Sequence, residues 1–134
     1  ELRRAADDPY AFAITLRETG EVMGKIKYQR DYCRYNTDSI SIGYELSRRY
    51  RHNGYMTEAL ARVIDYTFES MDINRIEAQH ELDNPASGRV MEKCGMRKEG
   101  VLRQRLYNKG KFVDVALYAI LRGDPRPKTQ GGQP

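Results

Sequence analysis

The sequence predicts an α/β (α+β) domain in which a mixed, mostly antiparallel sheet is flanked by helices. Several segments alternate apolar residues with small or polar ones, the period-two pattern of strands. Two other segments carry the spacing or end signals of helices. The predicted order is strand, strand, strand, helix, strand, helix, strand, strand, which mixes both element types in one unit.

A chain of 134 residues has room for one such domain. We expect that domain to span 1–122. Residues 123–134 are rich in Gly, Pro and polar residues, so we expect a disordered tail there.

The N-terminal half predicts three strands joined as an antiparallel meander. Residues 1–9 are charged and are interpreted as the end of a helix followed by a loop. Strands are expected over 10–16, 22–28 and 40–46, the last with apolar residues at every second position. The polar stretch 29–36 between the second and third strands predicts a loop.

The C-terminal half predicts a helix over 56–71, because apolar residues there recur at helical spacing and form one stripe. A strand is expected over 75–80. The next helix starts at Asn84, a suitable N-cap, and ends before Gly95. Two last strands, 97–106 and 112–121, flank a turn at 108–110 and form a hairpin.

Composition argues against several classes of protein. Hydrophobic residues make up 40% of the chain and charged residues 31%, and no apolar run approaches the roughly 20 residues of a membrane-spanning helix. No signal peptide opens the sequence, so a cytoplasmic protein is expected. Cys33 and Cys94 are too few for a disulfide scaffold and fit a reducing compartment. Only two histidines occur, and no close Cys/His spacing predicts a metal site.

A basic loop precedes the first long helix. The net charge is only +4, but its densest cluster, 48–52, comes directly before Asn53 and Gly54. The first N–H groups of a helix have no intrahelical partner and lie at its positive end, so this loop suits a phosphate. Gly54 would let the backbone approach closely, and Arg51 would add charge. The alternative is an ordinary Asn-Gly turn with solvated arginines.

Three blocks of residues, in this order, resemble the GNAT acetyltransferase superfamily and, within it, the RimJ/RimL-like N-acetyltransferases. The blocks are Ile42-Gly43-Tyr44-Glu45-Leu46 followed by Arg51-x-x-Gly54-Tyr55-x-Thr57-Glu58-Ala59-Leu60, then Asn84-Pro85-Ala86-Ser87, then Glu92-Lys93-x-Gly95-Met96. The resemblance covers residues 10–121 and implies the GNAT fold. Family members normally precede the strand at residue 10 with another strand and one or two helices, which we expect to be missing here.

The resemblance implies acetyl-CoA as co-substrate. It carries the pyrophosphate site over to Arg51, Asn53, Gly54, Tyr55, Met56 and Thr57, of which Met56 departs from the usual small residue. It carries the pantetheine site over to Glu45, Leu46, Ser47 and Asn84. Arg89 and Lys93 lie one helical turn apart and could face the adenosine 3′-phosphate, or form a solvated face.

The resemblance also implies direct transfer of the acetyl group to an amine, without a covalent enzyme intermediate. A backbone N–H between Tyr44 and Leu46 would polarise the thioester carbonyl. Ser87 matches a proposed thiol-protonating hydroxyl of close relatives, or helps to cap its helix. Glu45, through water, or His80 could accept the amine proton; each could equally be structural. Leu106 occupies a position at which close relatives carry an acid.

We therefore predict an acetyl-CoA-dependent N-acetyltransferase whose acceptor is a protein N-terminus or a small amine, with no nucleic acid or membrane partner and a possible homodimer. One alternative is a noncatalytic basic module that binds RNA or DNA through Arg48, Arg49 and Arg51. Another is a GNAT fold that binds CoA without activity.

Overall fold

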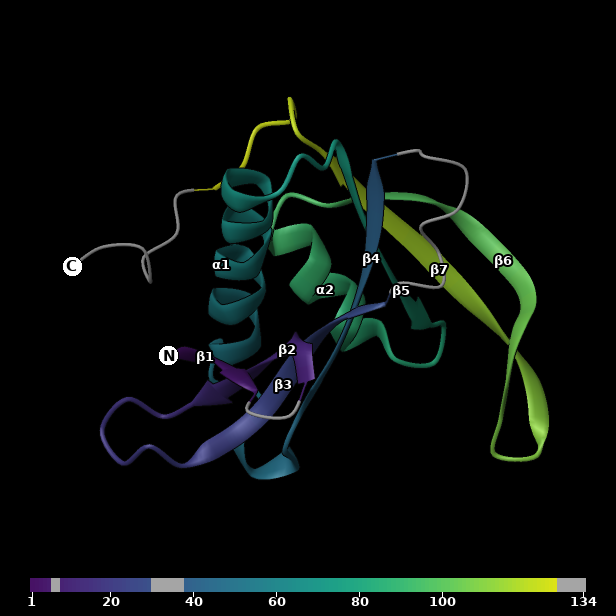
Figure 1. Ribbon diagram of the computed structural model, residues 1–134. Coiled ribbons are helices and arrows are strands. Elements are labelled where there is room, and N and C mark those ends of the chain that lie inside the picture. Colours follow the sequence, from purple (N-terminus) through teal and green to yellow (C-terminus); the bar gives the residue numbers. More distant parts are fainter. Residues whose placement is uncertain (6–7, 30–37, 128–134) are drawn as a thin grey trace.

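The computed structural model describes residues 1–5, 8–29 and 38–127 (Figure 1). These residues form a seven-stranded sheet and two α-helices. In chain order the elements are β1 (Leu2–Ala5), β2 (Asp8–Thr15), β3 (Val22–Gln29), β4 (Ser39–Leu46), the 3-10 helix η2 (Arg48–Tyr50), α1 (Tyr55–Ser70), β5 (Arg75–Glu81), α2 (Pro85–Lys93), β6 (Arg97–Asn108) and β7 (Lys111–Leu121).

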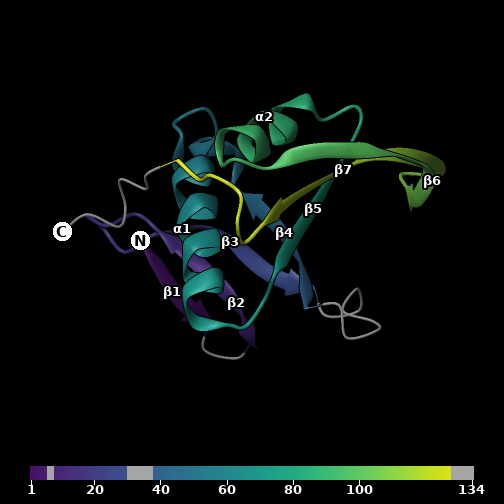
Figure 2. The same ribbon diagram turned by 90° about the horizontal axis from the view of Figure 1, so that it is seen from above.

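The strands lie in the order β1-β2-β3-β4-β5-β7-β6. Neighbours are antiparallel except for β4 and β5, which are parallel, so the predicted mixed, mostly antiparallel sheet is confirmed. Figures 1 and 2 show the β6–β7 hairpin extending away from α1.

The prediction for residues 1–9 is wrong. These residues contain β1 and the start of β2, and β1 pairs antiparallel with β2 through Leu2 and Ile14. A strand therefore precedes residue 10, where the sequence predicted the end of a helix and a loop. At four residues β1 is too short to show a period-two pattern, and the charge of its exposed Arg3 suits an edge strand, where charge discourages further pairing.

Both helices cover the same face of the sheet. The Tyr28 hydroxyl of β3 lies 2.6 Å from Thr67 Oγ1 of α1, and the Tyr44 hydroxyl of β4 lies 2.7 Å from Ser87 Oγ of α2. Tyr28 is the cross-strand partner of Ile42, which shares its side of β4 with Tyr44. We call this side of the sheet the helix face and the opposite side, which carries Glu45, the open face.

The apolar stripe predicted for the first helix is buried against this face. From Ala59 to Phe68 the predicted α1 positions are buried, whereas Met71 lies beyond the helix and is 37% exposed. Asn84 is the N-cap of α2, as predicted. Gly95 follows the C-cap with a φ of 92°, a conformation that favours glycine.

The described part of the predicted tail is packed against the domain. Asp124 accepts a hydrogen bond from the Leu121 N–H at 3.0 Å. Arg126 pairs with Asp65 at 2.9 Å and lies over the Phe68 ring. Two residues of the predicted disordered tail, Asp124 and Arg126, therefore contact the rest of the domain. Residues 128–134, and most of the predicted loop 29–36 with Cys33, lie outside the described residues.

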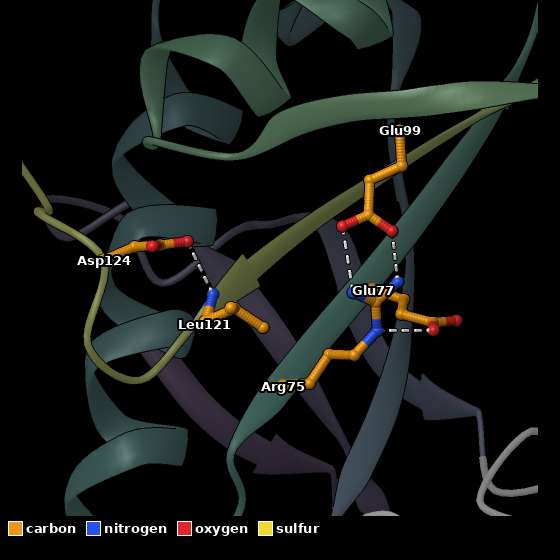
Figure 3. A network of polar contacts seen from close by, with 5 residues as sticks. All are labelled: Arg75, Glu77, Glu99, Leu121 and Asp124. Carbon is orange, nitrogen blue, oxygen red and sulfur yellow. Dashed lines mark hydrogen bonds and ion pairs between the residues drawn. The ribbon is translucent and has the colours of Figure 1, made fainter.

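An ion-pair network fixes β5 to β6 across the intervening β7 (Figure 3). Arg75 donates to both carboxylate oxygens of Glu99, at 2.6 and 2.9 Å, and to Glu77 at 2.8 Å. The bond to Glu99 raises the pKa of Arg75, and the guanidinium lowers the pKa of Glu99. Arg75 alternates with the buried Ile76, so the network lies on the open face.

Candidate active site

The ladder between β4 and β5 stops part-way along both strands. It joins Ser39 to Arg75, Ile40 to Ile76 and Ser41 to Glu77, although each strand continues for several residues. We call the separated parts, 42–46 of β4 and 78–81 of β5, the two sides of the strand gap.

Backbone register decides which groups of β4 face the strand gap. The Ser47 N–H donates to the Met23 carbonyl of β3 at 2.7 Å. In an antiparallel pair, residues turn toward and away from the partner strand alternately. The polar backbone groups of Ile42, Tyr44 and Leu46 are therefore directed away from β3 and toward the strand gap.

The same rule applies to β5. The Leu82 N–H donates to the Asp114 carbonyl just beyond the β5–β7 ladder at 3.2 Å, which directs the backbone groups of Gln79 and Glu81 toward β4. The Glu81 carbonyl accepts from the Asn84 N–H at 2.9 Å and from His80 Nδ1 at 2.7 Å. Two strand edges that do not pair with each other can receive an extended chain that carries amides.

The N-terminus of α1 has no side-chain cap. Gly54 is the N-cap residue, and the Asn53 amide turns back to the carbonyls of Tyr50 and Arg51 instead. As at any helix start, the N–H groups of the first turn, from Tyr55 to Thr57, have no intrahelical acceptor. A φ of 76° explains the glycine at 54, and a Cβ there would meet nothing within 4 Å. This end of α1 can accept an anion.

The arginines of the basic loop have different surroundings. Arg49 pairs with Glu21 at 3.4 Å and lies over the Tyr50 ring. Arg51 donates from Nε to the Leu46 carbonyl at 3.3 Å, which holds its exposed side chain between the strand gap and the start of α1. Arg49 and Arg51 therefore make different contacts, although they are close in the sequence.

The N-terminal turn of α2 lies on the helix-face side of β4. Tyr44 Oη lies 2.7 Å from Ser87 Oγ and also donates toward the Ser87 carbonyl at 3.2 Å. Burial raises the pKa of Tyr44 to about 12, although the bond to Ser87 lowers it. Asn84 is exposed and makes no side-chain capping bond. The Ser87 hydroxyl bonds to Tyr44, which lines the strand gap. Among the described residues, the contacts of this hydroxyl include no capping bond, which was the predicted alternative.

The two predicted base candidates lie on opposite faces of the sheet. The Glu45 side chain is on the open face, 71% exposed, and pairs with Lys25 at 3.4 Å. His80 is on the helix face, where its ring packs 5.5 Å from that of Tyr118. A Cβ on Gly88 of α2 would lie 2.7 Å from His80 Nε2, so the imidazole is pressed against that helix. The structure brings Ser87 and His80 to the same side and separates Glu45 from them.

Two residues near the strand gap were not predicted as side chains of the site. One is Tyr44, whose alternation with Ile42 already places it toward the helices. The other is Glu81, because the predicted strand ends one residue too early. Continuing the register of β4 and β5 sets Glu81 level with Glu45, and Asn108 donates to both its carboxylate oxygens, at 3.0 and 3.1 Å.

Other predicted residues have simpler surroundings. Arg89 and Lys93 are exposed on α2. Burial raises the pKa of Cys94 to about 12, which leaves it a protonated thiol rather than a nucleophile. Within residues 1–5, 8–29 and 38–127, no group of three or more His, Cys, Asp or Glu residues could hold a metal ion, and neither helix is long and apolar enough to cross a membrane.

Comparison with known proteins identifies the family. The family described as acetyltransferase (GNAT) domain matches residues 2–97. The chain belongs to the GNAT acetyltransferase family. This confirms the resemblance on which the site residues were chosen, and acetyl-CoA is the co-substrate of the family.

Among relatives, the uncharacterized N-acetyltransferase p20 of Bacillus licheniformis is 34% identical over 111 residues, which are 83% of this chain and 61% of the relative. The [ribosomal protein uS5]-alanine N-acetyltransferase of Escherichia coli is 31% identical, over 88% of this chain and 60% of its own length. The crystal structure of a GNAT-family acetyltransferase from Bacillus anthracis superposes with a TM-score of 0.77 at 30% identity, covering 86% of this chain and 68% of that one. The chain thus spans about three fifths of these curated relatives.

Proposed function

We propose that this chain carries the acetyl-CoA site of an N-acetyltransferase that moves the acetyl group directly to a primary amine. The observation that supports this most is the early end of the β4–β5 ladder, at Ser41 and Glu77. It leaves strand-edge amides beside a helix N-terminus, which is the combination that a long amide-containing arm with phosphates at one end requires.

The pantetheine arm would lie in the strand gap. Its amides would bond to the backbone groups of Tyr44 and Leu46, and the Asn84 side chain would take part from the other side. Ser47 is a weaker candidate than the sequence suggested, because its N–H already donates to Met23. Whichever of the Tyr44 and Leu46 N–H groups does not bond to the pantetheine amides would polarise the thioester carbonyl.

The phosphates would lie at the start of α1. The pyrophosphate would accept from the N–H groups of Tyr55, Met56 and Thr57, where the side chain of Met56 does not matter because only its backbone donates. Arg51 would supply the charge. We assign the adenosine 3′-phosphate to Arg89 and Lys93, which are exposed on one side of α2.

Chemistry would proceed across the strand gap. The neutral amine attacks the thioester carbon, a C–N bond forms, the C–S bond breaks, and the amine proton passes to a base while the thiolate leaves. Glu45 is the proposed base, through water, because it lies on the open face, opposite the α2 side on which the thiolate would be stabilised. His80 lies on the α2 side and is packed, so we assign it a structural role.

The proposed acceptor is a protein N-terminus or a small amine. A relative is a uS5-alanine N-acetyltransferase, which acts on an alanine. An α-amine has a pKa of about 7.7 to 8.0, so roughly a tenth is already neutral at pH 7, whereas a lysine near 10.4 is almost wholly charged. A base acting through water therefore suits an α-amine. The unpaired thiol of Cys94 supports a reducing, cytoplasmic setting.

A thiol-release assay over amines and N-terminal peptides tests the proposed activity. Acetyl-CoA should be consumed in step with acetylated product for at least one α-amine. Binding of acetyl-CoA with no turnover on any acceptor would favour the alternative of a CoA-binding fold without activity.

Glu45→Gln should lower kcat/KM about a hundredfold at neutral pH, because general base catalysis typically contributes at least that factor. Acetyl-CoA affinity should stay unchanged. Glu69→Gln, which removes an exposed carboxylate on α1, is the matched control. If Glu45→Gln is as active as the native chain and Glu81→Gln loses the activity, the base is Glu81 and the assignment to Glu45 is wrong.

A further inference from the structure

The side chain of Tyr44 joins the strand gap to α2 through its contact with Ser87. The backbone of Tyr44 lines the strand gap, while its side chain crosses to the first turn of α2 and meets Ser87 Oγ at 2.7 Å. One residue thus links the strand that would hold the thioester to the hydroxyl proposed to act on its sulfur.

We propose that Tyr44 is a positioning residue whose hydroxyl donates to Ser87 Oγ, so that the Ser87 O–H points to the thioester sulfur and stabilises the leaving thiolate by a hydrogen bond. This inference rests on the proposed function. It also changes the role expected for Ser87, from an acid that gives up its proton to a donor that keeps it.

Hydrogen-bond counting supports this arrangement. Tyr44 Oη has two acceptors within reach on Ser87, the Oγ and the carbonyl at 3.2 Å, and its single proton can be given to one at a time. When Oγ accepts it, the proton of Ser87 is available to another acceptor. Among the described residues, Ser87 Oγ has no hydrogen-bond partner besides Tyr44. The N-terminal turn of α2 also favours a negative charge nearby.

The pKa values of the Tyr44 hydroxyl and of a thiol distinguish a Ser87 that only donates a hydrogen bond from a Ser87 that gives up its proton. The Tyr44 hydroxyl has a pKa of about 12, raised by burial and by the nearby Cys94 and Tyr118. A thiol has a pKa of about 8.5. Passing a proton from Tyr44 through Ser87 to the thiolate would therefore be unfavourable by a factor of roughly a thousand or more. The thiolate leaves as an anion held by Ser87 Oγ–H, and solvent protonates it afterwards.

The test is the pKa of the thiol of bound CoA, read from thiolate absorbance as the difference between the complex and free protein. In the native chain this pKa should lie about one unit below that of free CoA, the effect of one hydrogen bond to a charged group. Ser87→Ala should return it to the free value, and Tyr44→Phe should raise it part of the way. With the active enzyme, kcat should fall about tenfold in Tyr44→Phe, while acetyl-CoA affinity stays within about twofold.

Tyr28→Phe is the matched control, because the Tyr28 hydroxyl also joins the sheet to a helix, 2.6 Å from Thr67 of α1, but away from the strand gap. The thermal stability of Tyr28→Phe should fall as that of Tyr44→Phe does. The pKa of the bound CoA thiol and kcat should stay unchanged in Tyr28→Phe.

Three outcomes overturn the inference. If Ser87→Ala shifts the thiol pKa and Tyr44→Phe does not, Tyr44 is structural only. If neither variant shifts it, the pair does not face the sulfur. If the native chain binds no CoA at all, the proposed function fails first, and calorimetry on the native chain distinguishes that failure from the other two.

Discussion

Arg49 and Arg51 are close in the sequence and differ in what their charges do. Arg49 is paired with Glu21 and lies over Tyr50. Among the described residues, the Arg51 guanidinium bonds to the protein only from Nε, which donates to the Leu46 carbonyl. The rest of the guanidinium is exposed beside the start of α1. Of these two arginines, Arg51 is therefore the one that we propose to neutralise the pyrophosphate of acetyl-CoA.

Arg51→Ala should weaken acetyl-CoA binding about tenfold, the loss of one charge-assisted hydrogen bond, and should reduce the dependence of affinity on salt. Arg49→Ala should leave affinity within about twofold and lower thermal stability slightly. Calorimetric titration at two ionic strengths measures both. Equal losses in the two variants would mean that the basic loop acts only through its total charge.

Residue types were predicted better than residue contacts. The basic loop and Asn84 follow from glycine and N-cap signals, Ser87 follows from the family resemblance, and these positions lie where a helix begins. The contact between Tyr44 and Ser87 joins residues 43 positions apart, and no local pattern encodes the distance between them. The opposite placement of Glu45 and His80 follows only from the shared register of β4 and β5.

At the scale of elements, the β3–β4 ladder holds the strand that lines the gap. Gly24 of β3 pairs with Leu46, and a Cβ on Gly24 would press against the Glu45 carbonyl oxygen and lie 2.9 Å from Leu46 Cα. These contacts are backbone atoms, which cannot move aside as the end of a side chain can.

Gly24→Ala should therefore lower the free energy of unfolding by about 1 to 3 kcal/mol and also weaken acetyl-CoA binding, because β4 must shift. Gly100→Ala in β6 is the control, since a Cβ there meets nothing within 4 Å. Denaturant unfolding and calorimetry give the two quantities. Full stability in Gly24→Ala would contradict the close packing of β3 on β4.

The Arg75–Glu99 pair predicts a pH-dependent contribution to stability. Since the pKa of Glu99 is lowered in the folded chain, the pair stabilises fully above the ordinary value of about 4.3 and loses its effect as pH falls through the lowered one. Glu99→Gln should cost about 0.5 to 1 kcal/mol at pH 7 and nothing at pH values below both pKa values. Urea unfolding across this range measures the difference, and a constant difference at all pH values would contradict the assignment.

Helices and strands were predicted well where the apolar pattern repeats over many residues. The helix over 56–71 and the strands of the meander and hairpin lie within a few residues of their predicted bounds. The prediction failed for β1, because four charged and apolar residues show no period and are strand only through pairing with β2. It also ended β5 at His80, since Glu81 looks like the start of a loop until its ladder with Val115 is known.

At the scale of the whole molecule, the two faces of the sheet carry different parts of the proposed site. Its helix face holds the core, α1 and α2, so the start of α1 and Ser87 belong to this side. Its open face carries Glu45 and Glu81 at the edges of the strand gap. An acetyl group held between β4 and β5 would thus be reached by the amine from one face and released from its sulfur on the other.

The alternative to this account is an RNA- or DNA-binding module that would use Arg48, Arg49 and Arg51. Such a module needs its basic residues on one common surface. Here Arg49 pairs with Glu21 at 3.4 Å, and Arg51 donates to the Leu46 carbonyl, so these two arginines make different contacts.

Calorimetric titration of the native chain with acetyl-CoA tests the central claim most directly. The account predicts saturable binding at one site per chain that weakens in Arg51→Ala. Absence of acetyl-CoA binding, together with tight and salt-sensitive binding of RNA by the same chain, would contradict it.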